Sequence, residues 1–252
     1  MAAKLATQTG YSLFELIIVI VIVAILATVA MKSLTSTNEV VRMEETRLEL
    51  EQLAYAVAGD PTAISGGTRT DYGYLGDVGA LPPDLDALVS NPGGLGTWNG
   101  PYLLDDFYAA AGGPASEFKI DAWGRPYVYS DGNSIISTGS GGNITRNIAN
   151  SADDLLYNAL TVTVVDLDND PPGMTYRDSV RVVLVHPDGA GGYRSRSVYP
   201  DANGLLVFDS IPIGRQTLRT VYLPTNDTLT RLVNIDPDRD SYLQTQLSSD
   251  VW

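Results

Sequence analysis

The sequence contains no cysteine and a single histidine, His186, among its 252 residues. Disulfides, thiolate metal sites and cysteine nucleophiles are therefore excluded, and so is a metal centre that needs several histidines. Basic residues are few. The chain has 16 Lys and Arg against 30 Asp and Glu, which gives a net charge of −14. Such a chain offers no basic patch to displace the counterions of a nucleic acid, so we expect no nucleic-acid partner.

Common catalytic motifs are also missing from the sequence. No Gly-x-Ser-x-Gly elbow accompanies His186. The glycine-rich run at residues 189–193 has neither the lysine nor the following helix of a phosphate-binding loop. No nucleophile pairs with a base, so we expect the protein not to be an enzyme and assign it no catalytic residue.

Proline is absent from the first 60 residues, and the run at residues 16–31 is apolar except for Thr28. From Tyr11 to the end of this run, a helix would cover about 30 Å, the thickness of a bilayer core. An apolar stripe at helical spacing then continues almost to Gly59. The sequence therefore predicts one uninterrupted helix over residues 11–58 that begins in a membrane and ends in a soluble head.

The charges around this segment predict its orientation. Lys4 precedes it and acids follow it, which places the N-terminus in the cytoplasm and the rest of the chain outside. A cleaved secretory signal is the alternative, with a weak cleavage site at residues 28–30. A cleaved signal would not need the helix to continue to residue 58, so we favour a retained anchor.

Glu15 stands inside the apolar segment, where an acid is costly and requires a partner. Residues 11–31 contain no cation. Cleavage after Gly10 would create one, the α-amino group of Tyr11. In an array of identical helices, Glu15 of one chain would then neutralise the amine of its neighbour and fix the register between subunits. An interfacial Glu15 that reaches the lipid headgroups is the alternative.

A short basic leader that ends in Gly10, followed by Tyr11 and Ser-Leu-Phe-Glu, resembles the type IV prepilin processing site. The resemblance implies that a prepilin peptidase removes residues 1–10 and methylates the new amine. It also implies that an inner-membrane platform and its ATPase extract subunits into a periplasmic or extracellular homopolymer. The residues expected to make the assembly contacts are Glu15, Leu13, Phe14, Leu16, Ile17 and Ile20.

Residues 59–154 are expected to form a small head. Two prolines before Asp84 predict a helix entry. Turns at Trp98 and Trp123, each followed by Pro-Tyr, predict aromatic strands. In this order, the segments resemble the head of the major pseudopilin of type II secretion, which packs a small antiparallel sheet on the second half of the long helix. The missing helix proline also favours pseudopilin ancestry, although pilus and pseudopilus both stay open.

The same resemblance implies a possible Ca²⁺ site, because that family often closes its head with a Ca²⁺-binding loop. Residues 137–154 correspond to this loop, with Asp153 and Asp154 as carboxylate ligands. Backbone carbonyls near Ser137 and Gly139 would complete the oxygen shell. Ser140 stands where the family pattern usually has Asp, which reduces the ligand charge, and a Gly/Ser/Asn linker with a capping role is the alternative.

Residues 155–252 are expected to form an antiparallel β-sandwich, because short alternating segments are separated by turns rich in Asp, Asn, Gly and Pro. Residues 201–214 resemble the transthyretin-like or carboxypeptidase-regulatory sandwich, a likeness that implies a fold and no activity. The seven predicted strands lie at residues 160–167, 179–186, 193–199, 204–211, 216–223, 230–235 and 242–247.

Two clusters place aspartates at alternate positions, residues 166–170 and 236–240. Each could present carboxylates to one cation. In the first cluster, Pro171 occupies the position where an EF-hand needs Gly, and Arg177 the position where it needs Glu. Aspartate is favoured in turns because it accepts hydrogen bonds from nearby backbone amides, so we predict turns at both places.

Together these features predict an α+β chain with a leader (1–10), a long helix (11–58), a pilin-like or pseudopilin-like head (59–154) and a β-sandwich (155–252). We expect a filament subunit that resides in the inner membrane before assembly. A monomeric, membrane-anchored binding protein or adhesin is the alternative function.

Overall fold

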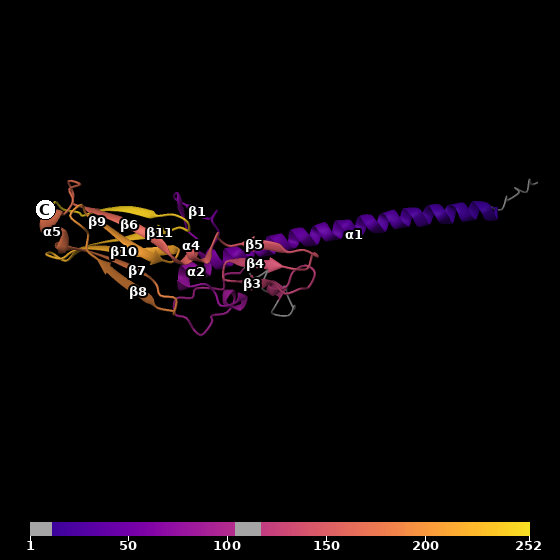
Figure 1. The fold of residues 1–252 in the computed structure, drawn as a ribbon, viewed down its shortest axis with the longest axis horizontal. Helices are drawn as coiled ribbons and strands as arrows, with labels where there is room; N and C mark the ends of the chain where they lie inside the picture. Colours follow the sequence, from indigo (N-terminus) through magenta and orange to yellow (C-terminus); the bar gives the residue numbers. More distant parts are fainter. Residues whose placement is uncertain (1–11, 104–116) are drawn as a thin grey trace, which may run out of the picture. The chain divides into compact units, whose positions relative to one another are not determined.

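The structure, a computed structural model, describes residues 12–103 and 117–252. Contacts divide the chain into two compact units, residues 1–45 and 46–252. The helix α1 (Leu13–Ala58) is continuous, as its lack of proline predicted (Figure 1). Its apolar part reaches a mean hydropathy of 3.0, so it is long and apolar enough to be a candidate membrane anchor or signal sequence.

The elements after α1 are β1 (Ile64–Ser65), β2 (Thr68–Arg69), α2 (Gly73–Val78), η1 (Leu85–Leu88), η2 (Glu117–Lys119), β3 (Val128–Ser130), β4 (Ser134–Ser137), β5 (Ile144–Asn147), α4 (Ala152–Leu156), β6 (Asn158–Val165), α5 (Gly173–Tyr176), η3 (Arg177–Ser179), β7 (Val180–Pro187), β8 (Tyr193–Val198), β9 (Leu205–Ile211), β10 (Gly214–Tyr222), β11 (Asp227–Ile235) and β12 (Ser241–Gln246). This mixture of helix and strand confirms the predicted α+β class.

The head packs on the second half of α1. Leu50, Leu53 and Val57 of α1 are buried with residues of η1 and of the antiparallel sheet β3-β4-β5. An Asp-Gly turn with positive φ at both residues joins β3 to β4. The predicted helix entry is confirmed, because the Asp84 carboxylate accepts a hydrogen bond from the amide of Ala87 and caps η1.

One predicted aromatic strand is confirmed and the other is wrong. Strand β3 follows Trp123 as expected, but residues 101–103 are not a strand. The amide of Tyr102 donates to the carbonyl of Leu88, and the Tyr102 ring packs edge-on against Tyr74 and Trp98. These contacts direct the backbone toward η1 and α2 instead of a neighbouring strand.

The seven predicted sandwich strands are confirmed as β6–β12. They form a sheet of order β11-β10-β7-β8 and a second sheet of order β12-β6-β9, which lie face to face (Figure 1). Alternate side chains of both sheets fill one core, with Leu160, Val182 and Phe208 fully buried. The expectation of an entirely antiparallel sandwich is wrong at one pairing, because β12 runs parallel to β6. The chain crosses from the first sheet to the second between β11 and β12, so no hairpin sets the direction of β12.

A third apolar cluster joins the predicted head to the predicted sandwich within the 46–252 unit. Ile213 is fully buried against Tyr72, Leu75 and Leu155. Its amide donates to the carbonyl of Leu155 at 2.9 Å. The two β-rich parts of this unit are therefore in direct contact through buried apolar side chains.

Candidate functional site

The first part of α1 presents an apolar surface on all sides. Every described side chain at residues 12–33 is exposed, including all the predicted assembly residues. Leu13 is 80% exposed and Phe14 is 72% exposed. A soluble helix hides its apolar stripe against a core, whereas a helix that is apolar all round needs lipid or other helices around it. This surface is therefore a candidate site of insertion or assembly.

Hydroxyl groups on α1 find partners within the helix itself. The hydroxyl of Thr28 donates to the carbonyl of Ala24 at 2.8 Å, and that of Thr37 donates to the carbonyl of Ser33 at 2.9 Å. Because hydrocarbon offers no hydrogen bonds, a polar side chain there must be satisfied by its own segment or by a neighbour. The one hydroxyl in the apolar run thus presents no barrier to lipid or to close helix packing.

Glu15 has a local role that the sequence reasoning missed. Ser12 precedes α1, and its Oγ accepts a hydrogen bond from the amide of Glu15 at 3.2 Å. This is one half of a capping box, and the Ser-x-x-Glu spacing was the sequence sign of it. Among residues 12–103 and 117–252, Glu15 forms no ion pair. Gly10 and Tyr11, the predicted processing residues, lie outside the described part.

The predicted Ca²⁺ residues take separate positions. Asp153 is exposed in the first turn of α4. Asp154 completes a capping box, because its carboxylate accepts from the amide of Ser151 and its own amide donates to the Ser151 hydroxyl. Within the described ranges, no three acidic or histidine side chains are placed to hold a metal. Calcium at Asp153 and Asp154 stays a prediction.

Ser137 and Gly139, expected near that cation, instead contact Asp121. The Ser137 hydroxyl and the Gly139 amide donate to Oδ2 of Asp121 at 2.6 and 3.0 Å. The amides of Trp123 and Arg125 donate to its Oδ1. Burial disfavours the charged carboxylate, but these hydrogen bonds outweigh it and lower the pKa of Asp121. Asp121 thus organises two loops of the head.

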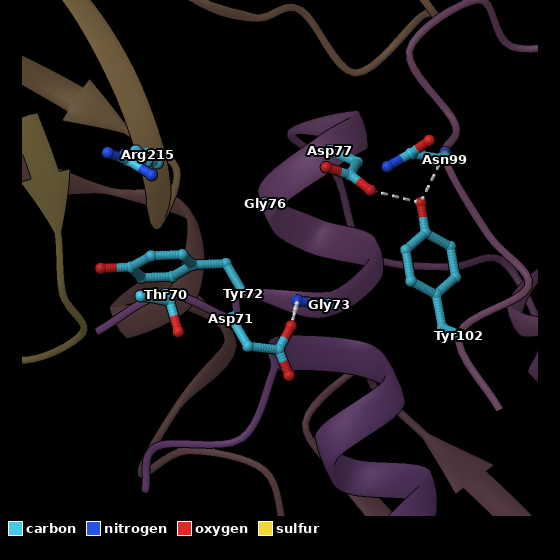
Figure 2. Close-up of a pocket in the computed structure, with 9 residues that line it drawn as sticks. All are labelled: Thr70, Asp71, Tyr72, Gly73, Gly76, Asp77, Asn99, Tyr102 and Arg215. Atoms are coloured by element: carbon cyan, nitrogen blue, oxygen red, sulfur yellow. Dashed lines mark hydrogen bonds between the residues drawn. The ribbon is translucent and has the colours of Figure 1, made fainter. Parts of the chain in front are cut away.

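A polar pocket of about 390 Å³ lies beside the N-terminal end of α2 (Figure 2). Asp77 and Tyr102 meet there through a 3.0 Å hydrogen bond, and the amide of Asn99 donates to the same tyrosine hydroxyl. Arg215 enters from β10, as Figure 2 shows. The pocket thus offers a carboxylate, a phenol, an amide and a guanidinium to a polar ligand.

The surroundings of Asp77 and Tyr102 shift the pKa of both groups in this pocket. Burial raises the pKa of Asp77, the hydrogen bond from Tyr102 opposes this rise, and the nearby charge of Asp71 adds to it. Burial also raises the pKa of Tyr102, which keeps its hydroxyl protonated at neutral pH. The sequence did not indicate this pocket, because its residues come from three distant segments and form no motif.

The two aspartate clusters adopt the predicted turns. In the first, Oδ1 of Asp166 accepts the amides of Asp168 and Asp170 at 3.1 and 2.9 Å. In the second, Asp236 accepts a hydrogen bond from Tyr72 at 3.0 Å, and Asp238 accepts one from the side-chain amide of Asn150. The second cluster therefore helps to join the sandwich to the head.

No family model matches this sequence, and no curated protein matches it. The crystal structure of BcpA, the major pilin subunit of Bacillus cereus, aligns at 14% identity over 45% of this chain and 36% of its own, with a TM-score of 0.26. The crystal structure of S.CueP aligns at 13% identity over 44% of this chain and 70% of its own, with a TM-score of 0.27. The Bacillus anthracis TIE protein aligns at 12% identity over 45% of this chain and 22% of its own, with a TM-score of 0.28. These partial likenesses assign neither a family nor a function.

Proposed function

We propose that this chain is a structural subunit of a type IV pilin-like filament, held in the inner membrane as a precursor and polymerised through α1. The observation that carries the proposal is the exposed surface of α1 across residues 13–33, which is apolar apart from Glu15, Thr28, Lys32 and Ser33. A bilayer would cover this surface before assembly. Neighbouring copies of the same helix would cover it afterwards, with Leu13, Phe14, Leu16, Ile17 and Ile20 among the contacts.

Processing after Gly10 supplies the charge that assembly requires. A prepilin peptidase would release residues 1–10 and leave the amine of Tyr11 at the start of the mature helix. Glu15 of one subunit would then face the amine of the next, and the low dielectric between packed helices would make any other register unfavourable. The platform and ATPase implied by the prepilin-like motif would drive extraction from the membrane.

Glu15 would serve two purposes in this scheme. Its amide already donates to Ser12, so the residue belongs to the cap of α1. Its carboxylate remains available to a neighbouring subunit. A glutamine at this position preserves capping-box chemistry but removes the charge, so the two purposes can be separated by substitution.

The same assembly suits either a surface pilus or a secretion pseudopilus. The continuous α1, which lacks proline, favours the pseudopilus under the resemblance stated above. The sandwich would face outward in both and would meet a surface or a cargo. Deletion of the gene distinguishes the two, because a pseudopilus predicts an export defect without visible fibres, and a pilus predicts loss of fibres from the cell surface.

A membrane-anchored, monomeric binding protein is the second candidate, and the polar pocket around Asp77 and Tyr102 favours it. That function would use the same anchor but would require no contact between helices. Neither candidate involves catalysis.

The first experiment is the intact mass of the protein recovered from the native membrane and from sheared surface material. We expect a chain that begins at Tyr11 and carries a methyl group. A chain that retains Met1, or one that begins near residue 30, would contradict the proposal, and a chain that begins at Tyr11 but sediments as a monomer would favour the binding protein.

The second experiment compares Glu15→Gln and Glu15→Ala with Glu45→Gln, an exposed acid on the same helix outside the apolar run. We expect filaments from the unchanged chain and from Glu45→Gln, and none from either Glu15 variant. Filaments formed normally by Glu15→Gln would show that the charge is dispensable and that Glu15 acts only in the cap.

A further inference from the structure

One buried carboxylate oxygen in the sandwich lacks a partner. Asp166 is fully buried where β6 ends, and its Oδ1 accepts the two turn amides described above. Its Oδ2 is also buried, and no donor within the described residues reaches it. A buried, unpaired carboxylate oxygen is expensive, and native structures usually satisfy such atoms with a donor, an ordered water or an ion.

A second carboxylate is brought to the same place by the chain that follows β12. Past the end of this strand, Leu247 donates to the carbonyl of Val165, and Leu167 donates to the carbonyl of Ser249. Asp250 consequently lies beside the 166–170 turn. The Asp250 carboxylate comes within hydrogen-bonding reach of the Asp166 carboxylate and lies near the carboxylates of Asp168 and Asp170. Two ionised carboxylates can only accept hydrogen bonds, so this approach is unfavourable without a shared positive charge.

We propose that Asp166, Asp168, Asp170 and Asp250 bind a divalent cation, Ca²⁺ in preference to Mg²⁺, between the 166–170 turn and the 247–252 segment. A shared proton would neutralise only one of the four acids, whereas a divalent cation offsets two charges. Ca²⁺ accepts about 6–8 oxygen ligands in flexible geometry, including backbone carbonyls and water, which suits an irregular turn. Mg²⁺ requires a near-ideal octahedron that such a turn does not impose.

Binding requires only surface side chains to move. In the described ranges no three acids yet converge on one point, but Asp168, Asp170 and Asp250 are exposed and can change rotamer at little cost. Asp166 is the fixed ligand, because its side chain is buried and held by two amides. The cluster at residues 236–240 provides the contrast, since Asp236 and Asp238 already have donors.

The cation would fasten the segment after β12 to the turn. Trp252 already donates from Nε1 to the carbonyl of Asp170 at 2.9 Å, and its ring stacks on Tyr176 with centroids 6.4 Å apart. The Tyr222 hydroxyl donates to the carbonyl of Val251 at 3.4 Å. A metal between Asp166 and Asp250 would add a strong link to these weak ones and would protect the segment from proteases.

The position of Trp252 provides a direct assay. Excited tryptophan transfers energy to a nearby bound Tb³⁺, a common replacement for Ca²⁺, so we expect sensitised Tb³⁺ luminescence from the full chain in detergent micelles. Ca²⁺ should displace the signal at lower concentration than Mg²⁺. When the excitation selects tryptophan over the neighbouring Tyr176 and Tyr222, Trp252→Phe should lose most of the luminescence while it leaves the effect of Ca²⁺ on thermal stability intact. A signal that persists in Trp252→Phe would place the ion elsewhere and overturn the proposal.

Substitutions then locate the ligands. At a hundredfold excess over Kd, Ca²⁺ should raise Tm by about 5–10 °C for a protein of this size. Asp250→Asn, at an exposed position, should weaken Ca²⁺ binding by at least about tenfold, and Asp166→Asn should abolish it. Asp238→Asn, in the other cluster, should bind as the unchanged chain does. If Asp166→Asn fails to fold, the Ca²⁺ affinity of Asp250→Asn tests the site by itself. An absence of any Ca²⁺-induced shift, or equal losses in Asp250→Asn and Asp238→Asn, would refute the site.

Discussion

Tyr127 donates its hydroxyl hydrogen to the carboxylate of Glu49, and this contact joins the head sheet to the second half of α1. Tyr127 is buried, whereas its neighbour Val128 is exposed, so the strand turns one face to the helix. The part of α1 at residues 46–58 therefore belongs to the folded core of the 46–252 unit, which its buried apolar side chains and this polar contact hold together.

Tyr127→Phe should lower the free energy of unfolding by about 1.5–3 kcal/mol, the range for a hydrogen bond to a charged group. Urea unfolding of the full chain in detergent measures this change. Tyr129→Phe is the matched control, because its hydroxyl reaches the Gly132 carbonyl only at 3.4 Å. Equal losses in the free energy of unfolding from the two variants would mean that the contact with Glu49 contributes no more than the weak hydrogen bond of Tyr129.

Stability should fall under alkaline conditions. Burial, followed by the hydrogen bond to Glu49, raises the pKa of Tyr127 in the folded state. The resulting stability is fully present below the unfolded tyrosine pKa of about 10 and is lost as the pH rises above it. Thermal unfolding at a series of pH values above about 9 should show a steeper loss in the unchanged chain than in Tyr127→Phe. Parallel curves would contradict this explanation.

Asp121→Asn should destabilise the head by about 2–4 kcal/mol, because one amide group cannot accept the four hydrogen bonds that Asp121 receives. The pKa of Asp121 is lowered in the folded state, so its contribution is present above the unfolded value of about 4 and is lost as the pH falls through the folded value. The acid-induced loss should therefore be smaller in the variant. Asp131→Asn, at an exposed turn, should change neither quantity.

Gly79 and Gly93 both have positive φ, near 78° and 75°, yet they should respond differently to alanine. A Cβ on Gly79 would lie 2.6 Å from the backbone oxygen of Pro187, whereas one on Gly93 would meet nothing within 4 Å. Gly93→Ala should cost about 1–2 kcal/mol for the backbone conformation alone. Gly79→Ala should cost clearly more, because α2 must move away from β7. Urea unfolding of both variants measures the two losses. Equal losses would contradict the close approach of Gly79 to the backbone of Pro187.

Ile213→Ala should destabilise the protein by about 2–5 kcal/mol, the usual effect of emptying a buried aliphatic site. Because Ile213 packs against both the head and the sandwich, we expect head and sandwich fluorescence to report one shared transition. Two separate transitions in the unchanged chain would mean that the head and the sandwich unfold as independent domains.

The elements that could be predicted from sequence are those whose signal is local. Missing proline and a continuous apolar pattern predicted α1, and alternation with turn residues predicted all seven strands from β6 to β12. Alternation indicates which face a side chain occupies but carries no information on the direction of a distant partner. The parallel pairing of β12 with β6 could therefore not be predicted from the sequence. The short helix α2 was not predicted, because its sequence contains glycines at positions 73 and 76, which are unfavourable inside a helix.

The candidate sites also differ in whether their sequence signal is local or depends on distant parts of the chain. The exposed apolar surface at residues 12–33 followed from consecutive residues of the sequence, and its use in assembly stays a prediction. The pocket around Asp77 and Arg215 depends on how the head meets the sandwich, and no short segment carries that information. The aspartates at residues 166–170 were visible in the sequence, but the isolation of a single oxygen of Asp166 became apparent only once its burial was known.

The parallel pairing of β12 and β6 has a consequence for the order of folding. Strand β6 lies between β9 and β12, so it has one open edge until β12 is synthesised, after every other strand of the sandwich. An unpaired edge of that kind readily joins a strand from another chain. A chaperone or a change in the rate of synthesis would therefore affect folding most during this interval.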